Sequence, residues 1–458
     1  MAKIIGLINK IVWGAPALIL ILGVGIYLSV RLRFVQITLF PESFRRFWRQ
    51  LLPGRDRIHR SSFRSLCTAL AATVGTGNLV GVAGAICLGG PGAIFWMWVC
   101  GVIGMVTKYT EALLSVRYRI RTEEGSLGGP MYYITQALPK AFHFLAPCYA
   151  FFGMVAAFGV GNAAQVNAAV TGVRECCRYF GRTLSPEAML LLTTFLAGII
   201  GILFFGGSGT IAAAAEGLVP IAAAGYILLC LGVLLLRWQQ IPDALSGIFL
   251  GAFSPGAVTG GLIGSALQSL RIGCSRGVFT NEAGMGTGAI AHGGAEDIHP
   301  AGQGMMGIIE VFLDTIVICT LTALVILVSG VPVPYGTDAG GILTAKAFSS
   351  VYGAGAVLWL TVSMTLFAVA AVLGWGFYGA RCAQFLFGRK AWRYFAMLQV
   401  PAVFAGAFLE TAAVWQISEA LNGLMAIPNL IALAMLAPEA ARLTKEYINS
   451  GGSSAGGG

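Results

Sequence analysis

The stretch that decides the fold reads Ala71-Ala72-Thr73-Val74-Gly75-Thr76-Gly77-Asn78 and lies inside an apolar run at residues 65–88. Glycine and polar residues in the middle of such a run predict a helix that is interrupted halfway along. A second stretch reads Thr259-Gly260-Gly261-Leu262-Ile263-Gly264-Ser265 and interrupts the run at 255–276, five runs later. Paired interruptions point to the binding site of a transporter, because unwound backbone at membrane depth is tolerated only where it lines a cavity.

The rest of the chain has the composition of an integral membrane protein. Of its 458 residues 57% are hydrophobic and only 10% are charged, whereas a soluble chain carries roughly 25% charged residues. Because about 20 apolar residues span a bilayer, we expect an all-α protein with about eleven transmembrane helices. They are predicted at 13–30, 65–88, 92–116, 147–173, 188–205, 212–236, 255–276, 304–329, 355–379, 392–411 and 415–436. Residues 1–449 then form one transport domain, and the Gly- and Ser-rich residues 450–458 form a flexible tail.

The formal net charge of +10 reflects membrane topology rather than nucleic-acid binding, because the basic residues gather in loops between apolar runs. Lys and Arg concentrate in cytoplasmic loops, which predicts a multi-pass protein of the plasma (inner) membrane with an external N-terminus and a cytoplasmic C-terminus. The loops predicted to be cytoplasmic contain Arg31, Arg33, Arg45, Arg46, Arg49, Arg55, Arg57, Arg60, Arg64, Arg117, Arg119, Arg121, Lys140, Arg381, Arg389, Lys390 and Arg393. The loop with Arg174, Arg178 and Arg182 does not fit, because this topology places it outside.

Five further runs of sequence resemble those of a known family. They are Gly89-Gly90-Pro91-Gly92-Ala93-Ile94-Phe95-Trp96-Met97-Trp98, Gly104-Met105-Val106-Thr107-Lys108-Tyr109-Thr110-Glu111-Ala112, Gly128-Gly129-Pro130-Met131-Tyr132, Arg276-Gly277-Val278-Phe279-Thr280-Asn281-Glu282-Ala283-Gly284 and Ala426-Ile427-Pro428-Asn429-Leu430. From Trp13 to about Leu436 the chain resembles the alanine or glycine:cation symporters, which are also called the sodium:alanine symporter family of amino acid carrier proteins. This resemblance implies a fold of the leucine-transporter type, with one extra helix (13–30) before two inverted five-helix repeats (65–236 and 255–436).

The resemblance also implies the function. We expect a secondary active transporter that imports a small neutral amino acid, alanine or glycine, together with a cation, expected to be Na⁺, by alternating access at a midplane site between the two broken helices. We expect neither a cofactor nor a bound metal beyond the transported cation, and no nucleic-acid or obligate protein partner; membrane lipid surrounds the chain. A proton-coupled or uncoupled carrier is the alternative, and a channel comes after it. The chain lacks a recognisable catalytic constellation, which argues against an enzyme.

The candidate site combines the interrupted helices with side chains that the resemblance supplies. Freed N–H groups at a half-helix N-terminus favour an anion, which predicts that Thr76 and Gly77 bind the substrate carboxylate. The resemblance adds Gln165 as a substrate contact and Trp375 as the ring that closes the pocket, and Ile263 is expected to form an apolar wall. The expected cation ligands are the carbonyl groups near Ala71 and Val74, with the side chains of Asn78 and Asp314.

One patch departs from the family pattern. Where many relatives have Ser-Thr ahead of the Gly-Trp pair, this chain has Ala370 and Ala371, whose side chains offer no oxygen to a sodium ion. Asp314 is then a candidate proton carrier, because an ionisable residue at membrane depth is functional by default. Lys108 and Glu111 are expected to form a structural pair on one helical face.

Overall fold

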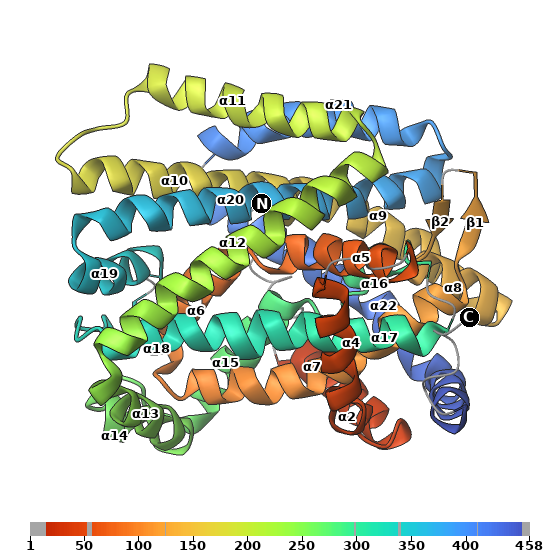
Figure 1. Cartoon of the computed structure of the whole chain (residues 1–458), viewed down its shortest axis with the longest axis horizontal. Coiled ribbons are helices and arrows are strands. Elements are labelled where there is room, and N and C mark those ends of the chain that lie inside the picture. The colour runs from red at the N-terminus through yellow and green to blue at the C-terminus, as the bar shows by residue number, and fades with distance from the viewer. Residues whose placement is uncertain are drawn as a thin grey trace.

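The computed structural model describes residues 15–52, 57–123, 125–296, 299–337, 340–409 and 411–450. In this part of the chain the protein is almost entirely helical, apart from a small antiparallel hairpin of β1 (Ile120–Thr122) and β2 (Gly125–Leu127). Long helices run side by side along the longest axis of the molecule (Figure 1). The predicted tail beyond Ser450 and the first two residues of the predicted run at 13–30 lie outside the described residues.

The first half of the chain contains helices that are broken as well as continuous. They are α2 (Ala15–Arg31), α3 (Val35–Thr38), α4 (Phe40–Leu51), α5 (Arg57–Thr73), η1 (Gly77–Gly81), α6 (Val82–Gly89), α7 (Ala93–Arg117), α8 (Pro130–Ala137), η2 (Lys140–Phe142), α9 (Leu145–Phe158), η3 (Gly159–Ala163), α10 (Ala164–Tyr179), α11 (Pro186–Phe205), α12 (Ser208–Leu236) and η4 (Trp238–Gln240).

The second half continues in the same way. Its helices are α13 (Ile241–Phe253), α14 (Pro255–Thr259), α15 (Ala266–Asn281), α16 (Thr287–His292), α17 (Pro300–Val311), η5 (Phe312–Cys319), α18 (Thr320–Val328), α19 (Gly340–Tyr352), α20 (Ala354–Phe387), α21 (Ala391–Phe408) and α22 (Thr411–Asn449). Figure 1 shows the hairpin at one end of the bundle and α13 at the other. We call these the hairpin end and the α13 end.

Seven helices of the described residues are long and apolar enough to cross a membrane, and a bent pair, Arg57–Thr73 with Gly77–Gly89, would be an eighth. The seven are Ala93–Arg117, Lys140–Tyr179, Pro186–Phe205, Ser208–Leu236, Pro300–Val328, Ala354–Phe387 and Ala420–Asn449. Every predicted run overlaps a helix of the structure. The total of eleven spans and the division into two repeats remain predictions.

The first predicted interruption is confirmed. Helix α5 ends at Thr73, and the chain bends by 52° before a helix resumes. The bend lies at Val74 and Gly75. Asn78 holds it in place, because its Oδ1 accepts a hydrogen bond of 2.9 Å from the backbone N–H of Gly75.

The second predicted interruption is non-helical but lies at a different depth. Residues 260–265 separate α14 from α15, and they lie near the α13 end. There the amide of Gln268 donates to the carbonyl of Leu88 at 2.9 Å, and Gly92, just before α7, packs against the backbone of Gly251 in α13. This stretch therefore joins two elements beside the point where α6 ends and α7 begins.

The interruption deep in the bundle lies instead between α15 and α16. Asn281 ends α15, Glu282 adopts a left-handed conformation with φ 54°, and α16 begins at Thr287. A methyl group added at Gly104, in the middle of α7, would lie 3.0 Å from the Cβ of Ala283. Further along, the Ser115 hydroxyl donates to the carbonyl of Ala289. The unit that runs alongside α7 is thus 266–292 and is broken at 282–286, which corrects the predicted span at 255–276.

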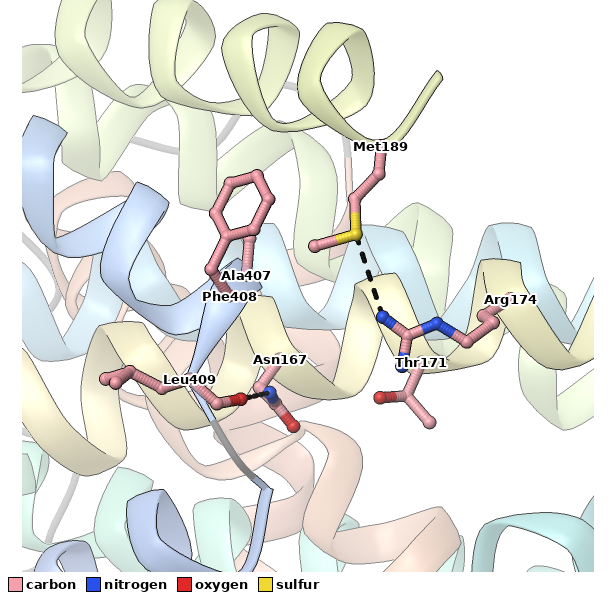
Figure 2. Close-up of a pocket in the computed structure, with 7 residues that line it drawn as sticks. All are labelled: Asn167, Thr171, Arg174, Met189, Ala407, Phe408 and Leu409. Atoms are coloured by element: carbon pink, nitrogen blue, oxygen red, sulfur yellow. Dashed lines mark hydrogen bonds between the residues drawn. The ribbon is translucent and has the colours of Figure 1, made fainter. Parts of the chain in front are cut away.

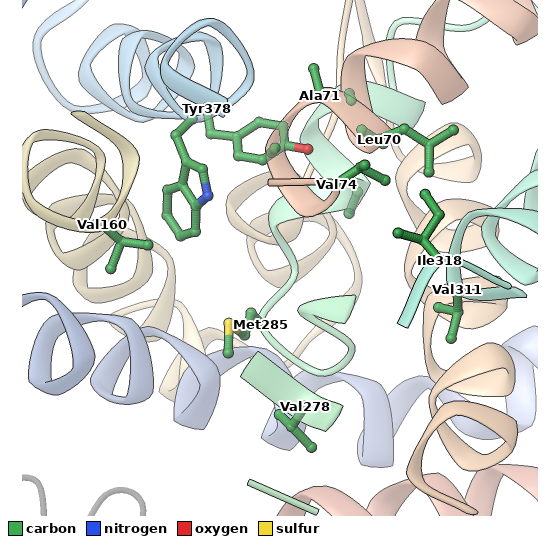
Figure 3. Packing of buried hydrophobic residues seen from close by; sticks show 14 of the residues in the cluster. Leu70, Ala71, Val74, Val160, Val278, Met285, Val311, Ile318 and Tyr378 are labelled. Atoms are coloured by element: carbon green, nitrogen blue, oxygen red, sulfur yellow. The ribbon is translucent and has the colours of Figure 1, made fainter. Parts of the chain in front are cut away.

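The core around the first break is built from small and branched residues. Figure 3 shows Ala71 and Val74 at the end of α5, Val160 in η3 and Met285 in the second break as members of one buried cluster. Glycine allows the backbones to approach closely: a methyl group added at Gly374 of α20 would lie 2.6 Å from the backbone nitrogen of Ala72. This packing fixes α20 beside the end of α5.

Candidate substrate and cation site

Two of the predicted substrate contacts meet directly. The Thr76 hydroxyl donates to Oε1 of Gln165 at 3.0 Å, and both side chains are buried. Gln165 in turn donates to the carbonyl of Val160 at 3.2 Å. That carbonyl belongs to η3, a short π-helical turn of the kind that often occurs at functional sites.

Gly77 has open space beside it. A Cβ at this position would meet no atom of the described residues within 4 Å. Because Gly77 opens the helix that follows the break, its N–H group belongs to a half-helix N-terminus, where an anion is favoured. The geometry is therefore compatible with the predicted carboxylate contact.

Helix α20 brings Trp375 and Ala371 to the same region. Trp375 is buried and packs against Gly161, where any side chain would collide with the Trp375 Cβ. One turn earlier, the Cβ of Ala371 lies 3.7 Å from the place where a Cβ on Gly75 would be, and Oε1 of Gln165 lies 3.6 Å from the same place. Ala371 therefore faces the first break, as its position ahead of the Gly-Trp pair predicts.

The break changes the hydrogen bonding at the end of α5. In a continuous α-helix the N–H of Gly75 would donate to the carbonyl of Ala71, four residues earlier. Here it donates to Asn78 instead, so the Ala71 carbonyl loses its intrahelical donor. A carbonyl freed in this way is a suitable ligand for a cation.

Asn78 connects the break to Asp314 in η5. Its amide donates to Oδ1 of Asp314 at 2.7 Å, and the Thr315 hydroxyl donates to Oδ2 of the same carboxylate at 2.9 Å. Asn78, Asp314 and Thr315 are fully buried. The predicted cation ligands Asn78 and Asp314 thus lie in direct contact, through a residue that also stabilises the break.

The structure does not place Ile263 with the other candidates. Its side chain lies 3.7 Å from the place where a Cβ on Gly90 would be. Gly90 follows the end of α6, thirteen residues after Gly77, which corresponds to about 20 Å of helix. The predicted role of Ile263 as a wall of the pocket has no support in this geometry.

A cluster of buried charges near the second break was not predicted. Lys108 forms an ion pair with Glu310 at 2.9 Å, and Nε2 of His292 lies 2.9 Å from the other oxygen of the same carboxylate. Glu111 accepts hydrogen bonds from the backbone N–H groups of Gly284 at 2.9 Å and Gly286 at 3.1 Å. The prediction that Lys108 pairs with Glu111 is therefore wrong. Lys108 binds Glu310 of α17, and Glu111 binds the backbone of the second break.

A cavity of about 380 Å³ lies elsewhere, between α10, α11 and α21 (Figure 2). Its lining residues are Asn167, Thr171, Arg174, Met189, Ala407, Phe408 and Leu409. Figure 2 shows Asn167 bonded to the Leu409 carbonyl and Arg174 directed at the Met189 sulfur. None of the predicted site residues lines this cavity, so it is distinct from the group around the first break.

Comparison with known proteins identifies the family. The profile of the sodium:alanine symporter family matches residues 1–454. The chain belongs to the sodium:alanine symporter family. It is 40% identical over 451 residues to the sodium/alanine symporter AgcS of Methanococcus maripaludis, covering 97% of each chain. It is also 40% identical over 452 residues to an uncharacterized transporter of Haemophilus influenzae, covering 97% of this chain and 96% of the other.

The fold agrees with this family. The structure is similar to that of the transporter MhsT, crystallised with L-phenylalanine, with a TM-score of 0.55 over 84% of this chain and 97% of the other. Sequence identity in that comparison is 13%, so the likeness concerns the fold alone, which is that of the leucine-transporter class. A member of the sodium:alanine symporter family is a membrane transporter that couples amino acid movement to a cation, and this chain is one.

Proposed function

We propose that this protein imports a small neutral amino acid, alanine or glycine, together with Na⁺, at a midplane site beside the first break. The observation that carries the proposal is the contact of Thr76 with Gln165 at the bend between α5 and η1. A zwitterionic substrate would replace this hydrogen bond and satisfy both groups. Its carboxylate would meet the N–H groups that begin at Gly77, and Trp375 would limit the size of its side chain.

Sodium would bind next to the substrate, at the end of α5. Na⁺ is a hard cation and prefers oxygen ligands. The Ala71 carbonyl lacks its usual donor because Gly75 binds Asn78, and the Val74 carbonyl lies in the bend. Asn78 and Asp314, which bind each other, complete the candidate set. We further infer that the two repeats correspond through the breaks at 74–75 and 282–286, so that the second repeat begins at α15.

Proton coupling is the second candidate. It is favoured by Ala371, which faces the break with a methyl group where a hydroxyl would supply an oxygen, and by the fully buried carboxyl of Asp314. The two candidates are separated by uptake of labelled alanine and glycine into proteoliposomes on which sodium and pH gradients are imposed separately. Uptake that follows the sodium gradient alone supports the proposal; uptake that follows the pH gradient alone overturns sodium coupling.

Gln165→Ala tests the position of the substrate site. The variant removes a buried hydrogen bond to a charged group, worth roughly 1.5–3 kcal/mol, so the Kd for alanine should rise about tenfold or more. Equilibrium binding of labelled alanine to the purified protein measures this effect. Gln136→Ala is the matched control, because that exposed glutamine binds only the Tyr118 carbonyl among the described residues. Equal affinities of the two variants would place the substrate elsewhere.

A further inference from the structure

Helix α4 (Phe40–Leu51) has an orientation unlike that of the long helices. In Figure 1 it runs across the direction of α5, α7 and α17, between the middle of the bundle and the hairpin end, and the ring of Phe40 packs against that of Phe312 at the end of α17. If the long helices cross the membrane, a helix perpendicular to them lies in the membrane plane. Its sequence, FPESFRRFWRQL, alternates aromatic and basic residues at helical spacing.

One face of α4 is apolar and exposed. Phe44, Trp48 and Leu51 have relative exposures of 43%, 57% and 44%. The rings of Phe44 and Trp48 are stacked with their centroids 6.4 Å apart. Aromatic and aliphatic side chains arranged in this way are typical of helices that lie in the interface of a bilayer.

A second face of α4 is basic. Arg45 and Arg49 are one turn apart and exposed, and neither forms an ion pair with a described residue. Successive helical residues are about 100° apart, so the two arginines form a face directly beside the exposed apolar stripe. Glu42 lies on this face as well and accepts a hydrogen bond from the Tyr447 hydroxyl. With the rings in the acyl boundary, both guanidinium groups reach the level of the headgroup phosphates, where Arg binds with well-matched geometry.

The third face of α4 fastens it to the transport bundle. The buried amide of Gln50 donates to the Ser62 hydroxyl of α5 at 3.0 Å, and Ser62 donates to Oε1 of Gln303 in α17 at 2.6 Å. Because its carbonyl oxygen accepts from Ser62, Gln303 presents its NH₂ group to Nδ1 of His292, at 2.7 Å. The other ring nitrogen of His292 then donates to Glu310. A chain of hydrogen bonds thus joins α4 to the charge cluster beside the second break.

We propose that α4 is a docking surface for anionic phospholipids, and that their binding raises the transport rate through the Gln50–Ser62–Gln303 connection. The chosen occupant follows from charge complementarity: two exposed guanidinium groups lie on one side of an exposed apolar stripe, and an anionic lipid offers acyl chains to the stripe and a phosphate to the guanidinium groups. The acyl chains of a zwitterionic lipid can also cover the apolar stripe, but its phosphate charge is already neutralised by the ammonium group of the same headgroup. Lipids with net negative headgroups therefore bind more tightly.

Lipid binding is tested on the full-length purified protein by native mass spectrometry, with phosphatidylglycerol and phosphatidylcholine as the probes. Each Arg near an anionic surface raises the affinity for it about fivefold. The double variant Arg45→Gln/Arg49→Gln should therefore lower retention of phosphatidylglycerol roughly thirtyfold. Retention of phosphatidylcholine should not change. Arg182→Gln, an exposed arginine at the α13 end, is the matched control. Equal retention of phosphatidylglycerol by the double variant and the parent overturns the proposal, and so does displacement of the lipid by inorganic phosphate or by an acidic peptide.

The effect on transport is tested in proteoliposomes with and without phosphatidylglycerol. Uptake by the parent should be several times faster with the anionic lipid, whereas the double arginine variant should transport at the same rate in both. Gln50→Leu should retain the lipid and lose the acceleration. A parent that transports equally fast in both bilayers overturns the regulatory part. Because retention of lipid is measured without substrate, a wrong assignment of the substrate or cation leaves that result unaffected.

Discussion

At the scale of single residues, Asn78 determines the chemistry of the first break. Its carbonyl oxygen takes the N–H of Gly75 away from Ala71, and its NH₂ group binds Asp314. One side chain therefore stabilises the bend, frees a carbonyl and orients a carboxylate. This combination is what a cation site between a broken helix and η5 requires, and it explains why the candidate ligands come from both halves of the chain.

The residue that would improve this site is Ala371. Because its Cβ faces Gly75 at the break, Ala371→Ser would add a hydroxyl oxygen beside the first break. One added ligand worth about 1.5 kcal/mol should lower the sodium concentration for half-maximal uptake roughly tenfold. Alanine uptake measured against sodium concentration checks this expectation. Ala380→Ser, a buried position elsewhere on α20, is the control. A parent that already saturates steeply at low sodium, with no change in Ala371→Ser, would contradict the interpretation of Ala371 as a weakened ligand position.

The sequence predicted the residues of the first break better than those of the second. The glycine-rich interruption predicted Thr76, and the family resemblance supplied Gln165 and the position of Ala371; the structure brings all three to the first break. Ile263 was assigned by analogy with that interruption. Two adjacent glycines such as Gly260 and Gly261 can form either a loop between helices at the end of the bundle or a break inside a membrane-spanning helix. Only the contacts with neighbouring helices show which of these two structures forms.

At the scale of elements, the second break depends on helix α7. The stretch from Glu282 to Gly286 is held by Glu111, whose carboxylate takes the backbone N–H groups of Gly284 and Gly286. Those groups would otherwise be unpaired deep in the bundle, at considerable cost. A pattern of apolar runs cannot reveal such a break, because its polar partner lies on another helix more than 170 residues away.

The Lys108–Glu310 pair joins α7 to α17, and removing one partner leaves an uncompensated buried charge. Lys108→Met should therefore destabilise the protein by roughly 3–5 kcal/mol, seen as a lower midpoint of thermal unfolding in detergent. Lys108→Met/Glu310→Gln should recover part of the loss, because the amide still accepts from His292 and carries no charge.

Arg117→Met provides the control for this prediction. Arg117 lies at the end of the same helix and pairs with Glu439 at 3.6 Å, with its side chain 48% exposed. An exposed pair contributes only about 0–1 kcal/mol, so this variant should unfold near the temperature of the parent. A double variant no more stable than Lys108→Met alone would mean that the buried charge of Glu310 is not the cause of the loss.

At the scale of the whole molecule, the ion pairs show which helix ends lie together. Arg57 pairs with Glu296, Arg64 with Glu216, and Arg117 with Glu439. These pairs bring the start of α5, the start of α12, the end of α7 and the end region of α22 to the hairpin end. The basic face of α4 lies in the half of the bundle nearer to this end. Positive charge concentrates where the loop pattern of the sequence predicted the cytoplasmic side.

This asymmetry leads to a prediction about orientation. Because Lys and Arg near the ends of spans remain on the cytoplasmic side, the hairpin end should face the cytoplasm. The end of α10 with Arg174 and Arg178, and the following loop with Arg182, should face outward despite their charge. The test uses a variant whose ten cysteines are replaced, into which either Arg121→Cys or Arg182→Cys is introduced. Both positions are exposed, the first in β1 and the second in the loop after α10. A membrane-impermeant maleimide added to intact cells should label Arg182→Cys and should reach Arg121→Cys only after the cells are opened. The reverse pattern would invert the proposed topology and would place the lipid-binding face of α4 on the external leaflet.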